Sequence, residues 1–213
     1  MIDSNFIGNY DYYFHSNDEP SKGFSPLVAA ASQLNVTRTV FSGNMHRFGG
    51  AIYLNRNTPS GSIDATITNC QIIQNKAAFG GALYTSTRLN VLDLYILDSN
   101  FTQNTVVKSI GSTADGGCLA FALSFATRIN VTLMRNYFIE NEVENDGGVL
   151  IYNSGSPSGS FYVRNNTFQG NKAINAGVFY LGQLLDYTGI NNTYIANLAE
   201  ENGFYFLKSF VNL

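Results

Sequence analysis

The chain has 213 residues, a net charge of −3 and only 13% charged residues. This excludes the basic surface typical of nucleic-acid-binding proteins, and it excludes an acidic tail. The chain contains 16 Phe, 13 Tyr, 20 Gly and four Pro. That composition favours strands joined by tight turns, because Gly tolerates positive φ. The length suffices for one domain with a continuous core.

The first residues, Met1 to Phe6, lack the basic and apolar regions of a signal peptide, so none is expected in this chain. A short motif, Phe6 to Asn9, is followed by residues 10–26, which we interpret as an insert or a degenerate coil. The most apolar stretch, residues 119–134, is interrupted by polar residues such as Arg128 and Asn130. It predicts two buried strands and no transmembrane segment.

From residue 34 onward, three segments recur in the same order. The first alternates apolar and polar residues, which is typical of a strand with one buried face. Its apolar positions include Leu34, Ala65, Leu94, Val131, Phe161 and Tyr187, and the polar or outward positions next to them are Asn35, Thr66, Tyr95, Thr132, Tyr162 and Thr188.

The second segment is an aromatic or aliphatic residue followed three positions later by Asn. The first position is occupied by Phe6, Phe41, Ile72, Phe101, Phe138, Phe168 and Tyr194, and the Asn positions are Asn9, Asn44, Asn75, Asn104, Asn141, Asn171 and Asn197. Successive Asn residues are about 31 residues apart on average. We expect an inward aromatic stack and a ladder of buried Asn amides that satisfies backbone groups at the turns.

The third segment is a glycine pair that opens another short strand. Its second glycine is present in all six copies, as Gly50, Gly81, Gly117, Gly148, Gly177 and Gly203. We expect the glycine pair to allow a sharp corner with positive φ before the next strand. Residues 27–31, before the first full repeat, are a degenerate equivalent of this segment.

These repeats predict an all-β, right-handed parallel β-helix of about six to seven coils with roughly 31 residues per coil. A unit made only of short strands cannot bury its apolar face alone, whereas stacked units form a continuous core. We therefore expect residues 1–213 to be a single domain.

The sequence offers only weak candidates for catalysis. Six residues before each ladder Asn, Asp98 and Arg135 occupy the same position in neighbouring repeats, and an outward pair of this kind is usually a surface ion pair. Motifs of polygalacturonases and pectate lyases are absent. His15 and His46 are expected to be solvated loop residues, and Cys70 and Cys118 to be unpaired structural residues. No metal site or cofactor is expected.

Five Asn-x-Thr sequons are candidate N-glycosylation sites in a eukaryotic secretory chain: Asn35, Asn100, Asn130, Asn165 and Asn191. A bacterial or cytosolic chain would not use them. Asn35 has the most favourable position, because it is outward on a predicted strand.

Phe41 to Asn44 followed by Gly49 to Ile52 resembles the paired repeats of the chlamydial polymorphic membrane proteins. This family has the pectin-lyase-like β-helix fold. The resemblance covers nearly the whole chain, and it implies an extracellular or cell-surface structural module that presents loops for adhesion to a protein or glycan. It also suggests that the chain is a fragment of a longer repeat protein. The alternative is a carbohydrate-active β-helix enzyme.

Overall fold

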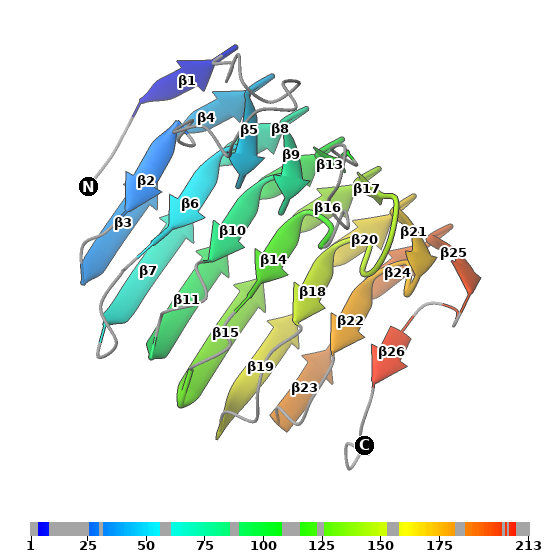
Figure 1. Cartoon of the computed structure of the whole chain (residues 1–213). Helices are drawn as coiled ribbons and strands as arrows, with labels where there is room; N and C mark the ends of the chain where they lie inside the picture. The colour runs from blue at the N-terminus through cyan, green and yellow to red at the C-terminus, as the bar shows by residue number, and fades with distance from the viewer. Residues whose placement is uncertain are drawn as a thin grey trace.

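The computed structural model describes residues 4–8, 26–29, 32–55, 61–85, 90–107, 116–122, 126–152, 158–181, 186–201, 203 and 205–207. Within these ranges, 26 short strands form four sheets, and every strand pairing is parallel. Figure 1 shows the strands stacked side by side along one axis.

Two of the sheets contain six strands. Sheet A holds the longest strands: β3 (Gln33–Thr37), β7 (Ser62–Thr68), β11 (Val91–Leu97), β15 (Arg128–Met134), β19 (Ser158–Arg164) and β23 (Asp186–Ile190). Sheet C consists of β5 (Met45–Phe48), β9 (Lys76–Phe79), β13 (Thr105–Val106), β17 (Glu142–Val143), β21 (Lys172–Asn175) and β25 (Leu198–Glu201).

The other two sheets contain seven strands. Sheet B consists of β1 (Asn5–Ile7), β4 (Val40–Ser42), β8 (Gln71–Ile73), β12 (Asn100–Thr102), β16 (Tyr137–Ile139), β20 (Thr167–Gln169) and β24 (Thr193–Ile195). Sheet D consists of β2 (Leu27–Ala29), β6 (Ile52–Leu54), β10 (Leu83–Thr85), β14 (Leu119–Phe121), β18 (Leu150–Tyr152), β22 (Phe179–Leu181) and β26 (Tyr205–Leu207).

From β3 onward the chain visits the sheets in the fixed order A, B, C, D, so the predicted all-β parallel β-solenoid is confirmed. One turn takes about 30 residues, as shown by the paired positions Leu34, Ala65, Leu94, Val131, Phe161 and Tyr187 of sheet A. The six strands of this sheet span about five turns, so the expected six to seven coils were slightly too many by this measure.

Strict alternation explains why the long strands form. On β11, Leu92, Leu94 and Ile96 are fully buried, while the residues between them face outward. The inward side chains of sheets A, B and D meet in one continuous core, and Val106, Val143 and Ala173 of sheet C form a separate small cluster. Each coil thus closes its core only against the coils before and after it, as expected for a solenoid.

Strand β2 pairs in register with β6, with Leu27 opposite Ile52. The degenerate copy of the glycine segment therefore lies in sheet D. Residues 10–25 of the predicted insert lie outside the described residues, and the interpretation of 10–26 stays a prediction.

Candidate functional site

The corner between sheets A and B carries the charged pair that the sequence offers as a catalytic candidate. One residue per coil turns this corner in the left-handed region, with φ between 47° and 57°: Arg38, Asn69, Asp98, Arg135, Asn165 and Asn191. Non-glycine residues reach this region at a modest cost, which is smallest for Asn and Asp. The corner thus projects polar side chains outward from neighbouring coils.

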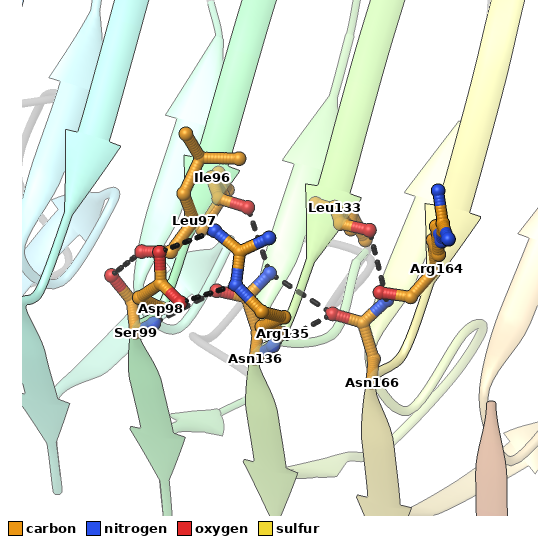
Figure 2. Close-up of polar contacts among 9 residues, drawn as sticks. All are labelled: Ile96, Leu97, Asp98, Ser99, Leu133, Arg135, Asn136, Arg164 and Asn166. Atoms are coloured by element: carbon orange, nitrogen blue, oxygen red, sulfur yellow. Dashed lines mark hydrogen bonds and ion pairs between the residues drawn. The ribbon is translucent and has the colours of Figure 1, made fainter. Parts of the chain in front are cut away.

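Asp98 and Arg135 form a bidentate ion pair at this corner (Figure 2). The distances are 2.6 Å from Arg135 Nε to Asp98 Oδ1 and 2.7 Å from Arg135 Nη2 to Asp98 Oδ2. The two side chains remain 35% and 47% exposed. The hydrogen bond from Arg135 lowers the pKa of Asp98 below its ordinary value, and the same bond raises the pKa of Arg135.

This arrangement suits an ion pair better than an acid–base catalyst. A general base works best with a pKa near the working pH, whereas Asp98 is held as a carboxylate with both oxygens engaged. In Figure 2 the guanidinium of Arg164, one coil further on, points away from the pair. The geometry therefore indicates that the ion pair holds the two neighbouring coils together at this corner. It does not support proton transfer by Asp98.

Directly behind the pair lies a second buried polar ladder, which sequence reasoning did not identify. Its members follow the left-handed residue of each coil: Thr39, Cys70, Ser99, Asn136, Asn166 and Asn192. Asn136 Nδ2 donates to Ile96 O at 2.8 Å and to Asn166 Oδ1 at 3.0 Å. The column mixes four residue types and contains Asn only in its last three coils, so no single residue type marks it throughout the sequence.

The ladder predicted from the sequence lies at the corner between sheets B and C. Asn44, Asn75, Asn104, Asn141 and Asn171 have no exposed surface. Each donates its side-chain N–H groups to a carbonyl of the preceding coil and to the Oδ1 of the following Asn, at 2.8 to 3.1 Å. Asn197 receives the last of these bonds, and Asn9 lies outside the described residues.

The aromatic stack lies on sheet B. Phe6 and Phe41 stack with ring centroids 4.9 Å apart, and the series Phe101, Phe138, Phe168 and Tyr194 stacks at 4.9 to 5.2 Å. Ile72 occupies the same column between Phe41 and Phe101. Such offset rings add to the stability from burial alone.

The two residues of each glycine pair have different roles. Positive φ belongs to the first residue of each pair: Gly49, Gly80, Gly116, Gly147 and Ala176. The second glycines, Gly50, Gly81, Gly117, Gly148 and Gly177, are instead needed for close backbone packing. A Cβ at Gly81, for example, would lie 2.9 Å from the amide nitrogen of Thr105. Gly203 alone among the six adopts positive φ, at 58°.

The expectation of a solvated His46 was wrong. His46 lies on β5 with its side chain facing the interior, and it is only 6% exposed. It shares its column with Ala77, so the alternation of the strand explains its burial. His15 lies outside the described residues.

Both cysteines are buried free thiols. Cys118 is a fully buried core residue, and burial raises the pKa of its thiol well above the ordinary value. Cys70 belongs to the second ladder, where its thiol lies 3.3 Å from the carbonyl oxygen of Thr68. The described residues contain no group of three or more His, Cys, Asp or Glu side chains suited to a metal ion.

The sequons fall in different environments. Asn35 is exposed on the outer face of sheet A, and Asn165 and Asn191 are exposed at the A–B corner. Asn100 and Asn130 are partly buried, and Asn130 donates to Asp93 Oδ1 at 2.7 Å. Asn35 therefore has the accessible position expected of it, while its modification stays a prediction.

The fold and its two polar ladders define the chain as a parallel β-solenoid. The chain is similar to a protein described as "Probable autotransporter YfaL" from Escherichia coli (strain K12), with 33% identity over 148 residues. The match covers 64% of this chain and 11% of that protein, so the chain corresponds to a small part of its relative. No protein-family model matches the chain, and no solved structure matches it.

In the part of the chain that the structure describes, no helix has the length and apolar character needed to cross a bilayer.

Proposed function

We propose that this chain is a surface-exposed or extracellular structural module whose solenoid presents loops for adhesion or recognition. The similarity to a probable autotransporter is the observation that carries this proposal. The resemblance to polymorphic membrane proteins points in the same direction, because it also concerns repeat proteins of the cell surface.

The way the coil is built supports this role. Its interior is filled by the core, the aromatic stack and the two ladders, which makes the solenoid a rigid support. Residues 55–61 and 153–157 are two of the segments that connect sheet D to sheet A along the chain, between β6 and β7 and between β18 and β19. Variable segments on a rigid support are the usual place for recognition.

Accessibility in intact cells tests the proposal. Antibodies raised against the purified chain would be applied to intact and to permeabilised cells of the native host, with an internal protein as the control. We expect labelling of intact cells that disappears after external protease treatment. Labelling that requires permeabilisation would overturn the proposal.

The competing function is a carbohydrate-active enzyme. Its candidate residues are Asp98 and Arg135, and the ion pair between them disfavours it. Incubation with acidic polysaccharides, followed by assays for unsaturated products and new reducing ends, separates the two functions. Turnover that is lost in Asp98→Asn, with the fold retained, would establish the enzyme instead.

A further inference from the structure

We propose that the outer face of sheet A binds an extended, uncharged glycan, with Tyr95 and Tyr162 as the two stacking platforms. This inference rests on the proposed surface function and deepens it by naming a ligand class and by placing a binding site on a sheet face, in addition to the loops.

The two tyrosines lie in one column of the outer face. The register across the six strands gives the order Asn35, Thr66, Tyr95, Thr132, Tyr162 and Thr188. Tyr95 and Tyr162 are therefore two strands apart, or about 9–10 Å. Tyr95 is 41% exposed and Tyr162 is partly exposed. Their neighbours in the column, Thr66, Thr132 and Thr188, are smaller than tyrosine, which favours access to the rings for a ligand that runs along the solenoid.

This spacing suits a sugar polymer. An extended glycan presents an apolar ring face at a regular repeat, and the separation of the two tyrosines is close to the length of one disaccharide unit. Tyrosine is well suited to such contacts, because its rigid ring offers a large contact area and its hydroxyl can hydrogen bond.

A preorganised polar column lies beside the tyrosines and would bind hydroxyl groups. Asp93 Oδ1 accepts from Asn130 Nδ2 at 2.7 Å, and Asp93 Oδ2 accepts from Arg128 at 2.9 Å. Asn130 Oδ1 in turn accepts from the Ser160 hydroxyl at 3.1 Å. Side chains held in place by such bonds lose little further freedom when a ligand binds.

The charge of the face indicates an uncharged ligand. Its outward positions contain three carboxylates (Asp64, Asp93 and Asp186) and two guanidinium groups (Arg128 and Arg164), which leaves one net negative charge. Anionic polysaccharides and nucleic acids would gain no net attraction there. A neutral polymer incurs no charge penalty and can use the donors and acceptors of the polar column.

Binding to a printed array of neutral and acidic glycans, followed by affinity electrophoresis in gels containing the best neutral polymer, tests the proposal. Tyr95→Ala combined with Tyr162→Ala is expected to weaken binding at least about tenfold. Tyr137→Ala is the matched control, because Tyr137 is 55% exposed on the outer face of sheet B. The control should bind like the unchanged protein, and circular dichroism should show that all variants are folded.

Three results would overturn the inference: no retention of any neutral glycan, retention of acidic glycans only, or equal loss in the Tyr137 control. The protein could also be applied to cells before and after enzymatic removal of their glycans. Binding that persists after this treatment would indicate a protein partner and would overturn the inference. If no neutral glycan binds but intact cells are labelled by the antibodies, the surface-module proposal stands. If intact cells are not labelled, that proposal is rejected independently of the glycan experiment.

Discussion

The A–B and B–C corners of the coil solve the same problem with different side chains. At each corner, a residue with positive φ precedes a buried residue that bonds to the neighbouring coils. At the B–C corner that buried residue is always Asn in the described coils. At the A–B corner it is Thr39, Cys70 or Ser99 in the earlier coils and Asn136, Asn166 or Asn192 in the later ones.

The comparison shows that the corner requires a small buried hydrogen-bonding group, and that Asn is only the most complete solution. Ser99 Oγ accepts from the Cys70 amide at 3.1 Å and donates to Leu97 O at 2.8 Å. Its hydroxyl donates only within its own coil, whereas Asn136 Nδ2 donates both to Ile96 O of the preceding coil and to Asn166 Oδ1 of the following coil. The A–B ladder should therefore tolerate exchange better than the B–C ladder.

The largest expected effect is for Asn104→Ala in the B–C ladder. The change removes bonds to Ile72 O and Asn141 Oδ1, and it leaves the amide groups of Asn75 without their acceptor. We expect a loss of about 3–5 kcal/mol in the free energy of unfolding, measured by urea denaturation with circular dichroism. A loss below about 1 kcal/mol would show that the ladder is not needed for stability.

The same serine substitution at both corners tests the difference directly. Asn104→Ser should cost about 1 kcal/mol more than Asn136→Ser. Asn104 accepts from the side-chain amide of Asn75, whereas the neighbour before Asn136 is Ser99, which donates to it only through its backbone N–H. Equal losses in parallel urea titrations would contradict the proposed distinction between the corners.

Cys70→Asn should extend the A–B ladder toward the start of the chain. The Cys70 thiol lies 3.7 Å from Val36 O, the carbonyl that corresponds to Ile96 O, the acceptor of Asn136. An amide is a stronger donor than a thiol, so we expect a gain of about 1 kcal/mol. Cys118→Asn is the contrasting control, because that core position should be strongly destabilised. A loss in Cys70→Asn comparable to that of the control would refute the idea.

The smallest expected effect concerns the outward ion pair. Asp98→Asn should lower stability at pH 7 by less than about 1 kcal/mol, since both partners are partly exposed. Because the pKa of Asp98 is lowered in the folded state, its contribution is present above about pH 4 and is lost as the pH falls through the folded pKa. Unfolding of variant and unchanged protein should therefore converge in acid. A difference that persists there would assign the effect to packing.

The sequence predicts those features of the coil in which one residue type recurs at the equivalent position of each repeat. The motif represented by Phe101 and Asn104 recurs along the chain with its internal spacing intact, so the aromatic stack and the B–C ladder could be placed by counting residues. The A–B ladder could not, because Thr39, Cys70, Ser99 and Asn136 share only their size and a polar group. One available signal was the position of these residues, five before each ladder Asn.

Other features depend on backbone details that composition does not report. Ala176 takes the positive φ that Gly147 takes one coil earlier, so a search for glycine misses it. His46 was misassigned because a polar residue between Met45 and Arg47 suggests a loop, while the register of β5 turns it inward. The face around Tyr95 becomes visible only when strands about 30 residues apart are set side by side.

The B–C ladder also gives the solenoid a polarity. Each Asn carbonyl points toward the preceding coil and one of its N–H groups points toward the following coil, so the amide dipoles align head to tail along the axis. Aligned dipoles polarise and strengthen one another in a dry interior, much as peptide units do in a helix. The ladder thus gives the solenoid a small net dipole along its axis, with the positive end toward Asn197 and the negative end toward Asn44.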